Sequence, residues 1–97
     1  METQLMTREV TVCDPDGLHM RPAQRLVRLA SRYSAQIHLG RGGDMMDCES
    51  ILSLLTLGAV QGDRLQLAAD GEDAAAAVDE ITAWFAAGFP EDEASVP

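Results

Sequence analysis

The sequence predicts an α+β domain in which an antiparallel sheet carries its helices on one face. Three observations predict it: segments with apolar residues at every second position, segments with apolar residues at helical spacing, and turn-forming residues between them. Together they give the order β-α-β-β-α-β-α within 97 residues, a length suited to one domain. We place this domain at residues 1–89 and expect residues 90–97 to be an acidic, disordered tail.

The first strand is expected over Arg8–Asp14, where Val10 and Val12 stand at strand spacing. Asp-Pro-Asp-Gly at residues 14–17 then predicts a turn. The first helix should run from about Met20 to Tyr33. In chain order, the remaining elements are expected at Gln36–Arg41 (strand), Met45–Asp47 (strand), Ser50–Leu57 (helix), Arg64–Ala69 (strand) and Glu72–Ala87 (helix).

The net charge of −9 argues against nucleic acid as a partner, because a phosphate backbone favours clustered positive charge. The chain has no lysine, and four of its seven arginines lie on one stripe of the first helix: Arg21, Arg25, Arg28 and Arg32. Such a stripe is either an ordinary solvated face or a docking surface, and we favour docking. No stretch is long enough to span a membrane and Met1–Thr7 is unlike a signal peptide, so we expect a cytoplasmic monomer.

The two cysteines, Cys13 and Cys48, have no spacing typical of a zinc site or a redox pair. We therefore expect two free thiols. The alternative is a metal or redox site built from both cysteines and His19, which would retain metal on purification or form a disulfide on oxidation.

The residues Gly17–Pro22 place a histidine and an arginine beside a helix start. A neutral imidazole is a nitrogen nucleophile near neutral pH, and a helix N-terminus favours an anion. Pro22 suits the first helical turn, and the guanidinium of Arg21 can bond phosphoryl oxygens. This set predicts a phosphorylated histidine at His19 in preference to a metal ligand.

Other titratable side chains near this segment leave alternatives open. Asp14 and Asp16 either point at His19, where they would oppose an incoming phosphoryl group, or form the turn and face solvent, which we favour. His38 stands on the polar side of its strand, so we expect an exposed histidine and no ligand role.

Two segments resemble the HPr family, the histidine-containing phosphocarriers of the bacterial phosphotransferase system. Gly17–Ala23 is similar to the active-site signature of the family, and Glu49–Gly58 to its second-helix motif, followed by the turn at Gln61–Asp63. The resemblance runs from about Arg8 to Phe89. It implies an open-faced β-sandwich of four antiparallel strands with three helices on one face.

The resemblance implies that His19 accepts a phosphoryl group on Nδ1 from enzyme I and passes it to a IIA protein or domain, serving sugar uptake and its regulation. Arg21 would lie against the phosphoryl group, and backbone N–H groups at Met20 and Arg21 would complete the cradle. The chain would then be a carrier and not an enzyme, with no cofactor or metal.

The family pattern further implies a partner-binding face comprising Met20, Arg28, Ile51, Leu52 and Leu55. Ser50 matches the position that a regulatory serine kinase phosphorylates in some members. Glu49 before it, where many members carry a basic residue, favours Ser50 as a plain helix N-cap.

Two alternatives stay open within this interpretation. The first is a nitrogen-related regulatory relative, a possibility to which Gly40–Gly42 and Trp84–Phe89 lend weight. The second is a protein-binding module that has lost phosphotransfer, against which the presence of both His19 and Arg21 argues.

Overall fold

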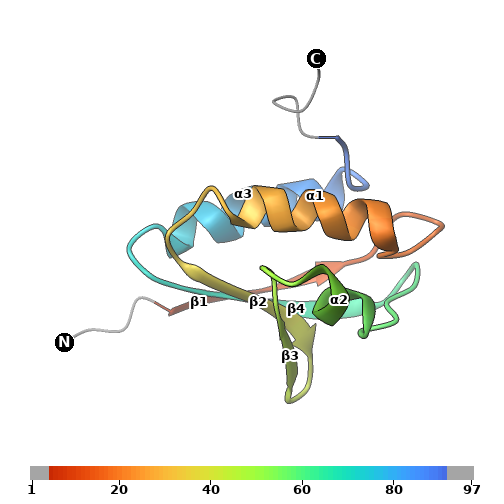
Figure 1. Ribbon diagram of the computed structural model, residues 1–97, viewed down its shortest axis with the longest axis horizontal. Helices are drawn as coiled ribbons and strands as arrows, with labels where there is room; N and C mark the ends of the chain where they lie inside the picture. Colours follow the sequence, from red (N-terminus) through yellow and green to blue (C-terminus); the bar gives the residue numbers. More distant parts are fainter. Residues whose placement is uncertain (1–4, 92–97) are drawn as a thin grey trace.

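The computed structural model describes residues 5–91, and within them lie four strands and three helices in the predicted order. The strands are β1 (Leu5–Thr11), β2 (Gln36–Arg41), β3 (Asp44–Asp47) and β4 (Arg64–Asp70), and the helices are α1 (Met20–Ala30), α2 (Ile51–Leu55) and α3 (Ala74–Ala86). The sheet has the order β1-β4-β2-β3, with every neighbouring pair antiparallel. The helices cover one face of it (Figure 1), which confirms the predicted α+β open-faced sandwich.

The core lies between the helices and the two central strands, because alternate residues of those strands face inward. Ile37 and Leu39 of β2 are buried, as are Leu65 and Leu67 of β4, whereas Gln36, His38 and Gln66 on the other face are more exposed. The helices add further fully buried side chains: Leu26, Leu54, Val78, Ile81 and Phe85. Removal of this apolar surface from water is the main stabilising term of the fold.

Helices α1 and α3 run side by side in opposite directions, so the start of α1 and the end of α3 lie at the same end of the molecule (Figure 1). After α3 the chain reverses at Phe89, whose φ of +62° is unusual for a bulky residue. Burial of the Phe89 ring against Trp84 and Phe85 holds this conformation, with ring centroids 4.6 and 5.1 Å away. The reversal carries the chain back toward α1.

The ends of β1 and α1 differ from the sequence prediction. β1 starts at Leu5 and stops at Thr11, because Val12 leaves the ladder: its N–H donates to Asp63 O at 2.9 Å and its carbonyl accepts from Gly62 N at 2.8 Å. α1 stops at Ala30 and not at Tyr33. The N–H of Tyr33 reaches only three residues back, to Ala30 O, so the last turn is no longer α-helical.

The two later helices are shorter than predicted. α2 is followed by turns with three-residue spacing, in which Leu57 N donates to Leu54 O, so the helical pattern ends at Leu55. α3 begins at Ala74, because the Asp73 carboxylate accepts hydrogen bonds from Ser34 N at 2.8 Å and Ala35 N at 2.9 Å. Asp73 thereby fastens the start of α3 to the loop before β2.

The predicted tail lies mostly outside the described residues, which end at Glu91. Its first two residues contact the rest of the domain: Pro90 O accepts from Trp84 Nε1 at 2.8 Å, and Glu91 pairs with Arg25 at 3.0 Å. Between residues 5 and 91, no helix combines the length and the apolar character needed to cross a membrane.

Candidate functional site

His19 is the N-cap residue of α1 and is exposed. Its backbone is extended, with φ −89° and ψ −168°, and its carbonyl accepts the first helical bond from Ala23 N at 3.0 Å. Its side chain makes no capping hydrogen bond. Within residues 5–91, no hydrogen bond uses the backbone N–H of Met20 or Arg21. Two free donors and the positive end of the helix dipole therefore lie beside an exposed imidazole, an arrangement that favours an anion.

A glycine fixes the loop that carries His19. Gly17 has φ +73°, and a Cβ built on it would lie 2.5 Å from Ala59 O. The next residue, Leu18, is buried and donates its N–H to Ala59 O at 3.0 Å. The loop also receives a hydrogen bond from Gln61 Nε2 to Cys13 O at 3.1 Å. Close backbone packing against the segment after α2 thus positions the imidazole.

Two carboxylates accompany His19. Asp14 and Asp16 form the predicted turn, with Asp16 N donating to Asp14 Oδ1 at 2.8 Å. Yet one potential ligand atom from each of Asp14, Asp16 and His19 lies within 4.8 Å of the others. The two residues form the turn as predicted, with Asp16 exposed and Asp14 half-buried, but their carboxylates also lie near the imidazole. Their negative charges oppose a phosphoryl group on the imidazole.

The same three side chains, Asp14, Asp16 and His19, could hold a metal ion, and they form the one such group of His, Cys, Asp or Glu in the described part of the chain. Two carboxylates and an imidazole are donors that divalent metals accept. The expectation of a phosphohistidine site without a metal stays a prediction.

The arginine stripe of α1 divides in two. Arg21 and Arg28 are exposed, and within residues 5–91 no hydrogen bond or ion pair holds the guanidinium group of either residue. Arg25 instead donates to Phe89 O at 2.7 Å and pairs with Glu91, leaving its side chain 16% exposed. Arg32 likewise faces α3, with Nη1 3.7 Å from Glu80 Oε2. The prediction of one solvated or docking stripe is therefore wrong for Arg25, whereas Arg32 stays exposed although it pairs with Glu80.

Apolar side chains are exposed on α1, on α2 and in the segment that follows α2. Of the predicted docking residues, Met20 is 50% and Leu52 74% exposed, whereas Ile51 and Leu55 are half-buried against the core. The sequence analysis missed Val60, which is 59% exposed and whose Cα would lie 3.1 Å from a Cβ on Gly17. An apolar residue inside a turn-rich segment was the only signal. We call Met20, Leu52 and Val60 the exposed apolar set.

Ser50 is the N-cap of α2, as the sequence predicted. Its side chain accepts a hydrogen bond from Ser53 N at 3.2 Å and is half-buried. Since the hydroxyl oxygen already bonds the helix start, Ser50 has a structural role that needs no modification. Phosphorylation of Ser50 stays a prediction.

The remaining candidates lie apart from this site. Both cysteines are free, as expected, but Cys48 is buried in the core, and burial followed by the charge of Asp47 raises the pKa of its thiol to about 12. A metal or redox site joining Cys48 to Cys13 and His19 is therefore wrong. His38 is half-buried on β2, opposite Asp47 in the sheet, and not exposed as predicted.

Comparisons with known proteins agree with this fold and site. Residues 6–87 match the family described as the PTS HPr component phosphorylation site. A phosphocarrier protein HPr from Haloferax volcanii is 40% identical over 78 residues, which cover 78% of this chain and 88% of that protein. A phosphocarrier protein NPr from Shewanella violacea is 41% identical over 86 residues, covering 89% and 94%.

Solved structures give the same result. HPr-C-His from Thermoanaerobacter tengcongensis matches with a TM-score of 0.83 and 29% identity, covering 90% of this chain and 98% of that one. The exposed His19 at the start of α1, on this sheet topology, agrees with the phosphocarrier family that these comparisons identify. The chain belongs to the HPr family, whose members are phosphocarrier proteins of the phosphotransferase system.

Proposed function

We propose that this chain carries a phosphoryl group on Nδ1 of His19, taken from phosphorylated enzyme I and passed to a IIA protein or domain. One observation carries the proposal: the exposed imidazole lies at a helix start where the N–H groups of Met20 and Arg21 have no hydrogen-bond partner within residues 5–91. Donors left free beside a nucleophile are suited to an anion that is present for only part of the cycle.

The transfer itself needs positioning more than binding. The Nδ1 lone pair of neutral His19 forms a P–N bond while the bond between phosphorus and the donor breaks. The guanidinium of Arg21 and the two free N–H groups compensate the charge on the phosphoryl oxygens. Asp14 and Asp16, whose oxygens lie within 4.8 Å of the imidazole, oppose that charge. Because this attraction and repulsion partly cancel, the phosphoryl group is not bound tightly and can be transferred to the next partner.

The exposed apolar set supports a docking role. Met20, Leu52 and Val60 offer exposed apolar surface on α1, on α2 and after α2, while Ile51 and Leu55 are half-buried. Arg28, about two helical turns after Arg21 on α1, adds an exposed positive charge. A small apolar patch with a charged rim suits brief encounters with successive partners. A phosphate on Ser50 would bring negative charge to α2 and weaken docking of an acidic partner.

Phosphotransfer from phosphoenolpyruvate through purified enzyme I tests the proposal. Intact mass should rise by one phosphoryl group in the wild type, and acid should remove it, as expected of a P–N bond. His19→Ala should show no increase. His38→Ala is the matched control, since His38 is the only other histidine, and it should behave as wild type. Failure of the wild type to gain phosphate would favour a protein-binding module without phosphotransfer.

A second candidate is the nitrogen-related branch of the same relay. The NPr relative is 41% identical to this chain and the Haloferax HPr is 40% identical, so the nitrogen-related branch stays a candidate beside the sugar-type one. Presenting phosphorylated chain to a sugar-type and to a nitrogen-type IIA protein distinguishes the branches. Faster loss of phosphate to the nitrogen-type protein would place this chain in that branch, and faster loss to the sugar-type protein would exclude it.

A further inference from the structure

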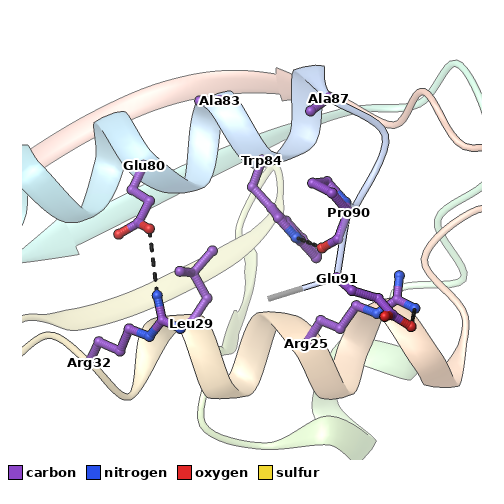
Figure 2. Close-up of a pocket in the computed structure, with 9 residues that line it drawn as sticks. All are labelled: Arg25, Leu29, Arg32, Glu80, Ala83, Trp84, Ala87, Pro90 and Glu91. Carbon is purple, nitrogen blue, oxygen red and sulfur yellow. Dashed lines mark hydrogen bonds and ion pairs between the residues drawn. The ribbon is translucent and has the colours of Figure 1, made fainter. Parts of the chain in front are cut away.

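A pocket lies between α1 and α3, and His19 is not among its lining residues. Figure 2 shows it framed by the two helices and by the chain that follows α3. Its volume is about 370 Å³, at the small end of the range typical of ligand cavities. Leu29 of α1 and Ala83, Trp84 and Ala87 of α3 provide an apolar lining. Such a lining offers apolar contact to a small hydrocarbon group.

The wall of the pocket is the chain just beyond α3. Reversal at Phe89 brings Pro90 over the groove, where its carbonyl accepts from Trp84 Nε1 at 2.8 Å. Glu91 then reaches Arg25, and the dashed lines in Figure 2 mark both contacts. The wall is therefore held by a few directed bonds, one of which is an ion pair at the rim.

Arg25 is a fixed cation at the edge of this apolar pocket. Its Nη1 donates to Phe89 O at 2.7 Å, which orients the guanidinium, and its side chain is only 16% exposed. A partly desolvated guanidinium needs an anionic partner, and carboxylates match its paired N–H donors. Glu91 Oε1 takes that role at 3.0 Å from Nη2.

The ion pair between Glu91 and Arg25 is weak. The Glu91 side chain is 65% exposed, so the pair exchanges with water at little cost. The contact shows which chemical group fits beside Arg25, namely a carboxylate. A free carboxylate bearing an apolar body would keep this contact and add burial against Leu29 and Trp84, which Glu91 does not provide.

We propose that the pocket between α1 and α3 binds a small aromatic or branched monocarboxylate, whose carboxylate displaces Glu91 from Arg25 and whose apolar part packs on Leu29, Ala83 and Trp84. This site is separate from the phosphoryl site, because it involves neither His19 nor the donors at the start of α1. The outcome of a test for carboxylate binding therefore leaves the phosphocarrier proposal unchanged.

The test uses the full chain and the fluorescence of Trp84, the only tryptophan in the sequence. Titration with 3-phenylpropionate should change Trp84 emission and saturate. The uncharged amide, 3-phenylpropionamide, has the same apolar body and should bind at least tenfold more weakly. Equal binding of acid and amide, or no saturable change with the acid, would overturn the proposal.

Two substitutions with opposite expected effects separate ligand binding from a structural role. Glu91→Gln removes the competing carboxylate and should tighten 3-phenylpropionate binding several-fold. Arg25→Gln removes the cation and should weaken it at least tenfold. If Arg25 and Glu91 only fastened the chain end, both variants would weaken binding together, and that result would count against the proposal.

A pocket-filling variant and a charge control complete the design. Ala83→Leu places extra volume in the pocket and should abolish binding of acid and amide alike. Arg64→Gln removes an exposed arginine from β4, far from the pocket lining, and should leave the titration unchanged. A response of Arg64→Gln equal to that of Arg25→Gln would mean that net charge, and not the pocket, attracts the acid.

Discussion

In the described part of the chain, backbone N–H groups at the start of α1 lack hydrogen-bond partners, whereas Arg25, on the side of the same helix that faces α3, is hydrogen-bonded. At the start, the N–H groups of Met20 and Arg21 have no hydrogen-bond partner within residues 5–91, and His19 is exposed. On the side, Arg25 bonds both Phe89 O and Glu91. One helix therefore presents free donors at its start and a hydrogen-bonded, ion-paired arginine on the side that faces α3.

This difference assigns phosphotransfer and stability to different parts of the helix. Groups left unsatisfied at the helix start contribute little to the fold but are free to meet a phosphoryl group. Groups that are paired between α1 and α3 hold the layers together, and another molecule reaches them only by displacing a partner that is already bound. Substitutions at the two regions should thus change different measurements, and the predictions below follow from that division.

The largest effect, a loss of stability, is expected from a substitution in the core beneath α3. Phe85 is buried between α3 and the sheet and packs against Trp84 and Phe89. Phe85→Ala leaves a cavity and should lower the free energy of unfolding by about 3–5 kcal/mol. Urea denaturation followed by circular dichroism measures this loss. Molecules that remain folded should still accept phosphate on His19, and a large loss of transfer per folded molecule would contradict the division.

The reverse pattern is expected for Leu52 on α2. Its side chain is 74% exposed, so Leu52→Ala should change the free energy of unfolding by less than about 0.5 kcal/mol. Loss of an apolar docking contact should raise the KM for phosphotransfer by about fivefold. Leu5→Ala removes another exposed leucine, at the edge strand β1, and should leave KM unchanged. Equal KM values in both variants would exclude α2 from docking.

The sequence predicted the elements well because their signals are local. Period-two alternation located β2 at Gln36–Arg41 without error, and turn residues located the loops around it. Helix ends were less accurate, because tertiary contacts decide them. α3 starts two residues late because Asp73 bonds the backbone of the loop before β2, which no local pattern reveals.

In the functional site, too, the sequence predicted local features but not contacts between distant residues. The motif around His19 identified the helix start, since that part of the geometry is encoded in consecutive residues. The roles of Arg25 and Phe89 could not be predicted, because the two residues are 64 positions apart and meet only through a left-handed reversal of the chain. The nearness of Asp14 to His19 likewise depends on how the loop closes over Ala59.

A smaller effect is expected from the carboxylates beside His19. Asp14→Asn and Asp16→Asn keep an acceptor oxygen for the turn but remove a negative charge within 4.8 Å of the imidazole. Each should raise the equilibrium level of phosphorylated protein by roughly threefold at low salt, and less at high salt. Quantifying phosphoprotein at fixed ratios of phosphoenolpyruvate to pyruvate measures it. Asp44→Asn, which alters an exposed carboxylate on β3, is the matched control.

The smallest effect concerns Asp73, where α3 meets the loop before β2. Hydrogen bonds from the backbone N–H groups of Ser34 and Ala35 lower the pKa of Asp73, with the bond from Ser34 the larger cause. A carboxyl group whose pKa is lower in the folded state adds stability above its ordinary pKa, near 4, and loses it as pH falls through the folded value.

Asp73→Asn should therefore lower the melting temperature at neutral pH, and the gap to wild type should shrink as pH falls below about 4. Thermal melts of both proteins across this range measure the gap. A gap that stays constant with pH would mean that packing of the side chain, and not its charge, holds the start of α3. The contact lies at the opposite end of α1 from His19, so phosphate acceptance should stay at the wild-type level throughout.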